Sequence, residues 1–293
     1  MMKSRRSSFV RSVAGAMVLT GLTGCASVAP DWLRRAEPAA AEPAAADRED
    51  EGRRVARERE EERARARTAV PASPLDVAPD AGRSEAVWSR AVNARGTRIV
   101  VSIRERALWL LDDSTTLMRA PVAVGMNDGF TYEGTRYHFE TPVSVRKVLE
   151  KGVAPLWVPP DWHYLEKVVE RGLEPVRLRA GRKEMLGDGT WIEIRGEQVG
   201  RVNQFGNFAP FTPGTEIIFD GKIYIPPFGT AQRRIPGILG SHKLAIGDGY
   251  LIHGTPEEDS IGDAVSHGCV RMYDEDVARL YDLAPVGTPV FLY

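Results

Sequence analysis

Cysteine is scarce in this sequence, and no apolar run indicates a multi-span membrane protein. Cys25 and Cys269 are the only two cysteines among 293 residues, and neither a C-x-x-C nor an H-E-x-x-H motif is present. The longest apolar run lies near the N-terminus and is short for a transmembrane helix. Basic and acidic residues nearly balance, with a net charge of −1. This balance does not suggest nucleic acid or an anionic membrane surface as a partner.

The N-terminus has the organisation of a secretory signal. A basic region precedes the apolar stretch VAGAMVLTGL at 13–22, which closes in small residues. The next residues, LTGC at 22–25, resemble the lipobox of bacterial lipoproteins. We therefore predict a signal peptide over 1–25 and lipidation at Cys25, which would anchor an exported protein on a membrane, facing the periplasm or cell wall. The alternative is an ordinary secretory signal with a chance cysteine.

If the protein is exported, the compartment bears on whether Cys269 is a free thiol or part of a disulfide. In an oxidising compartment two cysteines would suggest a disulfide. If Cys25 carries lipid, Cys269 has no partner and remains a free thiol. A lone thiol in an exported protein indicates a reactive residue worth testing.

Residues 26–95 have the composition of a linker. Stretch 37–46 is a low-complexity Ala/Pro/Glu sequence, and 68–82 is punctuated by proline. Between them, 47–67 alternates glutamate and arginine at spacings that support a solvated single helix, and it lacks the apolar positions of a coiled coil. We expect a tether that lets an anchored domain reach outward, or padding without a specific role.

Folded character begins near Thr97. Residues 97–113 alternate and are rich in Val, Ile and Leu, which predicts two paired strands around the turn at Arg104–Arg106. Several further segments have the same β pattern, and 161–172 and 273–283 have helical periodicity. The further predicted strands are 116–126, 138–150, 190–205, 215–227, 243–255 and 287–293. The sequence predicts a mostly-β domain with a few short helices.

Cys269 lies in the stretch SHGCVRM at 266–272, and three interpretations compete for it. A buried, inert cysteine would lie in an apolar run, whereas the neighbours here are polar or glycine. A zinc site would use His242, His253, His267 and Cys269, but no metal-binding motif supports that set. The pattern favours a nucleophile.

A cysteine nucleophile needs a base, a group that orients the base, and donors for the oxyanion of the intermediate. His253 ends a predicted strand sixteen residues before Cys269, and two adjacent strands can bring imidazole and thiol together. Gly268 lacks a Cβ, so the backbone beside the nucleophile can present its N–H groups to a substrate carbonyl.

HGT at 253–255 followed by SHGCVRM at 266–272 resembles the signature of the L,D-transpeptidase catalytic domain, also called the YkuD domain. The similarity extends over roughly 97–293 and includes the Thr141-Pro142 region and the C-terminal segment 280–292. The resemblance implies a β-sandwich-like catalytic domain over 96–293. It also implies peptidoglycan stem peptides as substrates, with no cofactor and no metal.

The resemblance implies a role for each matching residue. Cys269 would attack the third residue's carbonyl in a tetrapeptide stem and expel D-alanine, and an amine acceptor would then form a 3→3 cross-link. His253 would be the base, oriented by the Gly254 carbonyl. The further roles are oxyanion donation by the backbone N–H groups of His267, Gly268 and Cys269, and substrate binding by Ser266 and Arg271. His267 would be a catalytic residue, with positioning or partnership with the Ser266 hydroxyl as alternatives. For Arg271 a structural ion pair remains an alternative.

Residues from about 150 to 235 exceed what a minimal domain of this kind requires, and they are rich in aromatic residues and proline. We expect either a lid or groove wall for the substrate, or an insertion with a small core of its own. Within it, 161–172 predicts a helix packed through Leu165, Val168 and Val169.

Other functions remain open on the same residues. Water in place of the amine would make the protein an L,D-carboxypeptidase or other peptidoglycan hydrolase, and a protein acceptor would make it an anchoring transferase. A non-catalytic wall-binding lipoprotein would tolerate loss of His253 or Cys269, and both are present. A zinc peptidase predicts sensitivity to chelators, whereas a cysteine enzyme predicts sensitivity to thiol reagents.

Overall fold

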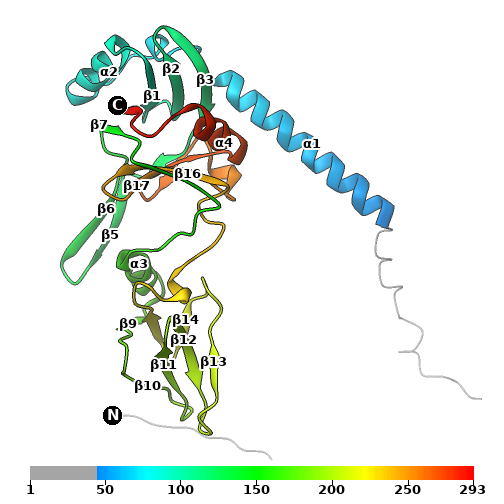
Figure 1. The fold of residues 1–293 in the computed structure, drawn as a ribbon, viewed down its shortest axis with the longest axis vertical. Helices are drawn as coiled ribbons and strands as arrows, with labels where there is room; N and C mark the ends of the chain where they lie inside the picture. Colours follow the sequence, from blue (N-terminus) through cyan, green and yellow to red (C-terminus); the bar gives the residue numbers. More distant parts are fainter. Residues whose placement is uncertain (1–44) are drawn as a thin grey trace, which may run out of the picture. The chain divides into compact units, whose positions relative to one another are not determined.

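The computed structural model describes residues 45–293 (Figure 1). The chain divides into two compact units, 1–55 and 56–293. The predicted signal peptide and lipobox, including Cys25, lie outside the described residues. Within those residues, no helix is both long enough and apolar enough to cross a membrane.

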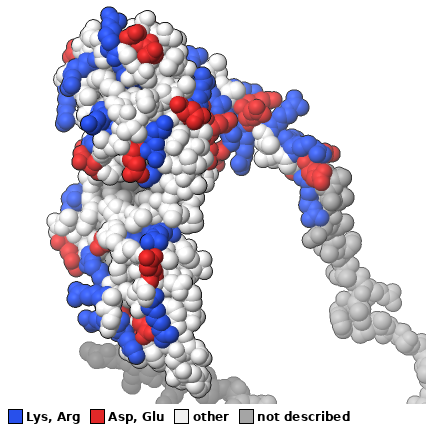
Figure 2. All heavy atoms as spheres, in the orientation of Figure 1, with Lys and Arg blue, Asp and Glu red and all other residues white. Residues whose placement is uncertain are grey.

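Helix α1 (Ala45–Ala69) confirms the single helix expected from the charged stretch. Acidic and basic side chains pair at helical spacing, for example Arg53 with Asp50 at 2.5 Å and Arg54 with Glu51 at 2.7 Å. Figure 2 shows the alternating charges along α1. Pairs one turn apart support a helix whose surface is polar on all sides.

The first sheet of the β domain, residues 96–293, has the order β3-β2-β1-β20-β7. Its strands are β1 (Thr97–Ser102), β2 (Ala107–Asp112), β3 (Thr115–Pro121), β7 (Ser144–Lys147) and β20 (Pro289–Leu292). The predicted pairing of β1 with β2 is confirmed, and β20 runs parallel to β1. Because side chains alternate along a strand, Ile99 and Val101 face one side of this sheet and Val100 faces the other.

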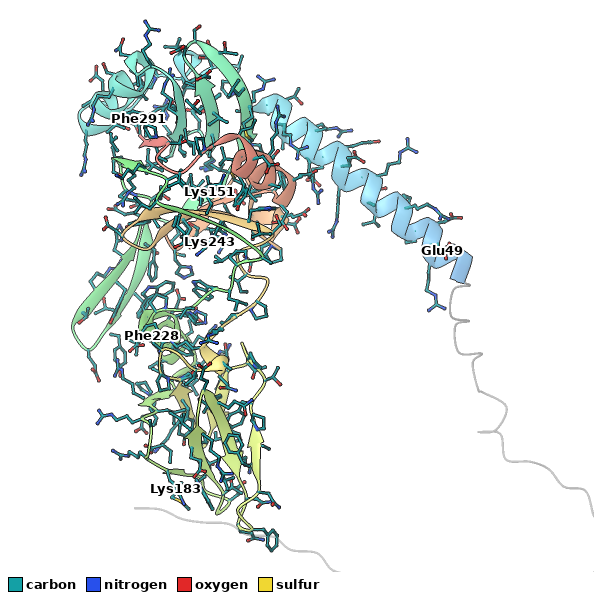
Figure 3. All side chains as sticks on the ribbon, in the orientation of Figure 1. Glu49, Lys151, Lys183, Phe228, Lys243 and Phe291 are labelled. Atoms are coloured by element: carbon teal, nitrogen blue, oxygen red, sulfur yellow. The ribbon has the colours of Figure 1, made fainter. Side chains whose placement is uncertain are left out.

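The second sheet has the order β19-β17-β16-β8. Its strands are β8 (Glu150–Val153), β16 (His242–Gly247), β17 (Tyr250–Gly254) and β19 (Val270–Met272). Lys151 and Lys243, labelled in Figure 3, mark where β8 runs beside β16. Helix α4 (Asp274–Leu283) adds Val277 and Leu280 to the core that the two sheets share. The predicted sandwich-like, mostly-β domain and its C-terminal helix are confirmed.

The outer face of the first sheet corrects the predicted linker boundary. Helix α2 (Arg83–Asn93) and the segment before it, with η2 (Pro74–Asp76), cover Trp109 and Phe291. Val87 and Ala91 of α2 are buried there, and the Trp109 indole donates to the Pro71 carbonyl at 2.8 Å. The prediction that the linker continues to residue 95 was wrong for residues 70–93, because apolar side chains in that segment complete this core.

The inserted segment has small cores of its own and also lines a cleft that Cys269 lines as well. It contains α3 (Asp161–Arg171), β9 (Glu174–Arg177), β10 (Glu184–Met185), β11 (Trp191–Arg195), β12 (Gln198–Val202), β13 (Phe208–Pro210), β14 (Ile217–Phe219), β15 (Lys222–Ile225) and η3 (Ala231–Arg233). Strands β10 to β13 form one sheet, and β14-β15-β9 form another. Ile192, Val199 and Ile217 are buried in one cluster. Phe228, labelled in Figure 3, lies under the Arg233 guanidinium at 3.8 Å.

Helix α3 confirms the predicted helix with one correction. Leu165 and Val168 are buried, but Val169 is 47% exposed. Leu165 and Val168 lie three residues apart on one face, whereas Val169 follows on the solvent side of that stripe. The hairpin of β5 (Asp128–Tyr132) and β6 (Thr135–Phe139) packs against the same helix.

Two short strands complete the surroundings of SHGC. Strand β4 (Val124–Gly125) runs parallel to β18 (Ala264–Ser266), and η4 (Glu258–Ser260) lies between β17 and β18 in sequence. These elements place the stretch 266–272 beside β17.

Candidate active site

Parallel strands bring the predicted base and nucleophile to one cleft. In the pairing of β17 with β19, His253 lies opposite Arg271 and Ile252 opposite Val270. Cys269 directly precedes β19, two residues from Arg271, so these side chains share a face with His253. His253, Cys269 and Arg271 all line a cleft of about 610 Å³.

The turn that carries Cys269 requires glycine before the nucleophile. Gly268 has a φ of 114°, and a Cβ there would lie 2.9 Å from the Glu140 carbonyl oxygen. Thr141 Oγ1 donates to the Gly268 carbonyl at 2.9 Å and accepts from the Gly125 N–H at 2.8 Å. The Thr141 hydroxyl therefore fixes the nucleophile turn to β4, a role that the sequence did not reveal.

Ser266 forms hydrogen bonds within the turn that carries Cys269. Its hydroxyl donates to the Cys269 carbonyl at 2.6 Å and accepts from the Gly268 N–H at 3.1 Å. The residue is 2% exposed. The substrate-binding role expected of Ser266 and the oxyanion role expected of the Gly268 N–H concern groups that, in this structure, bond to each other and to the Cys269 carbonyl. Such internal bonds hold a loop in one conformation.

His253 is oriented by the group that the resemblance implied. Its Nδ1 lies 2.5 Å from the Gly254 carbonyl oxygen, an acceptor only, so Nδ1 carries the proton and Nε2 is the bare nitrogen. The side chain is 4% exposed. Burial, with a smaller contribution from the Arg271 charge, lowers the pKa of His253 to about 4. The imidazole is therefore neutral at neutral pH and can accept a proton.

Cys269 is a free cysteine, and the residue as a whole is intermediate in exposure. Burial raises its pKa, while a hydrogen bond from the Leu251 backbone and the charge of Arg271 lower it. With His253 neutral and the thiol pKa raised, the resting pair is thiol and imidazole rather than thiolate and imidazolium. Proton transfer then belongs to the attack on substrate, which is general-base catalysis.

Arg271 makes the ion pair that was the alternative to substrate binding. Its Nη1 donates to Glu257 Oε2 at 2.6 Å. The Arg271 side chain is 17% exposed and that of Glu257 68% exposed. A partner so exposed costs little to exchange. The guanidinium therefore has a structural pair in this state and still faces the cleft.

His267 contacts the inserted segment. Its Nε2 lies 3.0 Å from Glu166 Oε2 on α3, and its ring stacks on Trp162 with centroids 4.7 Å apart. Phe139 meets the same ring edge-on at 4.5 Å. Helix α3 is thus a wall of the cleft beside the nucleophile. The sequence missed Glu166 and Trp162, since only a known approach of α3 to SHGC would have singled them out.

The side chains named for a zinc site are not assembled as one. Among the residues that the structure describes, no three His, Cys, Asp or Glu side chains are arranged to hold a metal ion. His242 instead lies with Nδ1 3.0 Å from Ser241 Oγ and with its ring 4.8 Å from that of Tyr281.

A family model described as the L,D-transpeptidase catalytic domain, YkuD, matches residues 96–292. The chain belongs to this family. The probable L,D-transpeptidase ErfK/SrfK of Escherichia coli K12 is 44% identical over 155 residues, covering 51% of this chain and 44% of that protein. The probable L,D-transpeptidase YbiS of the same strain is 50% identical over 52 residues, 18% of this chain and 17% of that protein. The matched part is thus less than half of each of these relatives.

Solved structures of L,D-transpeptidases are also similar to this chain. An L,D-transpeptidase from Mycobacterium smegmatis has 16% identity and a TM-score of 0.35, covering 67% of this chain and 58% of that chain. The catalytic domain of the Enterococcus faecium L,D-transpeptidase has 14% identity and a TM-score of 0.35, covering 69% and 99%. Every candidate residue of the cleft lies inside the range that matches the YkuD family, as does the inserted segment.

Proposed function

We propose that this YkuD-family chain is a cysteine L,D-transpeptidase that acts on peptidoglycan stem peptides. The observation that carries the proposal is the bond from His253 Nδ1 to the Gly254 carbonyl, which leaves Nε2 as an acceptor in the cleft that holds the Cys269 thiol. An imidazole held in this tautomer is what a thiol nucleophile needs. Membership of the family supplies the reaction class.

In the first half-reaction, the Cys269 sulfur attacks the carbonyl of the third stem residue while its proton passes to His253 Nε2. The tetrahedral intermediate then collapses, the bond to D-alanine breaks, and the proton on Nε2 moves to the leaving amine. A thioester on Cys269 remains. The neutral resting pair suits this sequence, because charge forms only as the sulfur attacks.

In the second half-reaction, an amine of another stem attacks the thioester and gives its proton to Nε2. The sulfur leaves, takes the proton back from the imidazolium, and a 3→3 cross-link results. Arg271 is a fixed cation at the cleft that can pair a stem carboxylate in exchange for Glu257. Helix α3, through Trp162 and Glu166, is proposed as the wall that holds the stem.

The experiment incubates the full chain, purified in detergent, with tetrapeptide muropeptides and follows the products by mass spectrometry beside Cys269→Ala. We expect a muropeptide dimer with release of D-alanine, absent in the variant. Tripeptide without dimer would replace the transferase by a hydrolase on the same residues. Absence of any Cys269-dependent product would refute both.

We also propose that the protein is exported and held on a membrane by lipid on Cys25, facing the periplasm or cell wall. The basic, apolar and LTGC segments of the N-terminus support this. Cys25→Ala should move the protein from the membrane to the soluble fraction. Unchanged partitioning would contradict the anchor.

A further inference from the structure

The C-terminal half of α1 is held on the catalytic domain by two arginines. Arg63 donates to the Glu258 carboxylate from Nη2 at 2.5 Å and from Nε at 3.2 Å, and Arg67 Nε donates to Asp276 at 2.9 Å. Both guanidinium groups lie over the Tyr273 ring, at 5.6 and 5.8 Å. The two arginine side chains are 24% and 29% exposed. This is a partly desolvated network, in which each charge matters more than in an isolated surface pair.

One of these contacts falls on the segment that joins the base to the nucleophile. Residues 255–263, the connecting segment, run from the end of β17 to the start of β18 and include η4. Glu258 of this segment contacts Arg63, and its neighbour Glu257 contacts Arg271 at 2.6 Å. In the described part of the chain, the remaining hydrogen bonds of 256–261 close within the connecting segment. Residues 256–261 are therefore tied to the rest of the domain by two ion pairs, whereas the end of the connecting segment is held by backbone bonds from the Gly262 N–H to the Val122 carbonyl and from the Val124 N–H to the Asp263 carbonyl.

The charges around η4 make the arginine of α1 necessary there. Glu257, Glu258 and Asp259 are consecutive acidic residues, and Glu275 lies near enough to share Arg63, at 2.7 Å. Without the Arg63 guanidinium, the half-buried Glu258 carboxylate has like charges beside it. A buried charge without its partner is costly, and the turn would move toward water to hydrate it. Glu257 would move with the turn and release Arg271.

We propose that Arg63 is a positioning residue: from α1 it holds Glu258 and the first part of the connecting segment, and so keeps Glu257, the exchangeable partner of Arg271, beside the cleft that holds Cys269. The inference rests on Cys269 as the nucleophile of the proposed function. It makes the charged helix a part of the active-site support as well as a spacer. A guanidinium that has lost its partner beside the connecting segment can swing away from Cys269, and since its charge favours the thiolate, loss of Arg63 should make Cys269 less reactive.

The test compares Arg63→Ala with Arg65→Ala in the full chain in detergent. Arg65 lies on the same helix, is 83% exposed and contacts Glu61 at 3.9 Å, so it is a matched control. The rate of alkylation of Cys269 by uncharged iodoacetamide is measured by peptide mass spectrometry, and hydrogen exchange is measured over the connecting segment. We expect Arg63→Ala to slow alkylation about fivefold and to speed exchange in 255–263. Arg65→Ala should change neither.

Charge exchange separates positioning from general destabilisation. Arg63→Glu with Glu258→Arg should restore the alkylation rate that Arg63→Glu alone lowers. Equal alkylation rates in Arg63→Ala and Arg65→Ala would overturn the proposal. So would a double variant whose alkylation rate is no higher than that of Arg63→Glu alone. If Arg63→Ala does not fold, the comparison of the double variant with Arg63→Glu decides the question. Alkylation of Cys269 needs no peptidoglycan. If the variants differ in alkylation as expected but the protein forms no cross-links, only the proposed function is refuted.

Discussion

His253 is buried, and among the residues that the structure describes no carboxylate forms an ion pair with its ring. Its ring donates to the Gly254 carbonyl, and the cation Arg271 faces it from the next strand. Burial lowers its pKa from 6.5 to about 4. Below pH 6.5 the unfolded chain binds a proton that the folded chain does not, so the free energy of unfolding decreases as pH falls from about 6.5 toward 4.

The same shift predicts the acid side of the pH–rate profile. The base is competent while it is unprotonated, so we expect the acylation rate to fall with an apparent pKa near 4 rather than 6.5. Single-turnover release of D-alanine from a tetrapeptide, measured from pH 7 downward, checks this. Circular dichroism at each pH serves as the folding control. An inflection near 6.5 with the fold intact would contradict a buried, neutral base.

Gly268 permits a second residue-scale prediction. At its φ of 114°, alanine is strained, and the new Cβ meets the Glu140 carbonyl oxygen at 2.9 Å. Gly262 has a comparable φ of 99° and no atom within 4 Å of a Cβ, so Gly262→Ala tests strain without the clash. We expect Gly262→Ala to cost about 1 kcal/mol in the free energy of unfolding and Gly268→Ala more than 2 kcal/mol. Urea denaturation measures both.

The same two variants, Gly268→Ala and Gly262→Ala, should also differ in kcat. Because the residue after Gly268 is the nucleophile, displacement of its backbone should reduce kcat at least about a hundredfold. Gly262→Ala should retain most of it. Similar activities in the two variants would show that the turn tolerates the displacement.

Helix α3 joins the inserted segment to the nucleophile turn. Its apolar side packs on the hairpin of β5 and β6 and on β15, and from its other side Trp162 and Glu166 reach His267. The 3.6-residue period of 161–172 was sufficient to predict the helix. Its target was not predictable, since Glu166 and His267 are 101 residues apart in sequence and no local pattern connects them.

Removal of the Glu166 carboxylate should affect catalysis more than folding. Glu170, one turn later on α3, is exposed, and Glu170→Ala is the control. We expect Glu166→Ala to lower kcat about tenfold and the free energy of unfolding by about 1 kcal/mol or less, because the lost pair is partly exposed. Glu166→Gln, which keeps a hydrogen-bond acceptor beside the His267 ring, should recover part of kcat. A loss seen equally in Glu170→Ala would assign the effect to the helix alone.

Strands were predicted well from the sequence, and hydrogen bonds between them were not. The apolar residues of β1, β2, β16 and β17 sufficed to predict these strands, because each strand contributes buried side chains to the core. Thr141 shows the limit: Thr-Pro predicts extended backbone, but its bonds to Gly125 and Gly268 depend on three segments meeting. Residue types indicated the base and nucleophile, whereas the supporting bonds came from tertiary structure.

At the scale of the whole molecule, the prediction that 70–93 belongs to a linker was wrong because it rested on the average composition of the segment, which does not show where single apolar side chains lie. It is rich in proline and charge, yet its few apolar side chains are placed to cover Trp109. Burial depends on the surface that receives a side chain, and that surface is formed by strands distant in sequence. The charged helix before it was predicted correctly, because its periodic charges are a local property.

Truncation tests this assignment. A chain of residues 95–293 would expose Trp109, Val100 and Phe291, whereas a chain of 70–293 keeps them covered. We expect the melting temperature of the shorter chain to be at least about 10 °C lower, with aggregation, since several buried apolar side chains lose their cover. Thermal unfolding followed by light scattering measures both. Equal stability of the two chains would show that 70–93 contributes nothing to the fold.

The parallel pairing of β1 with β20 also bears on how the protein folds. Ile99 pairs with Val290, so the centre of the first sheet joins residues that lie roughly 190 positions apart, across the whole inserted segment. The hairpins within that segment close loops of a few residues and can form early. Closure of the sandwich is then a late step with high contact order. Until β20 arrives, the free edge of β1 is exposed to pairing with other chains.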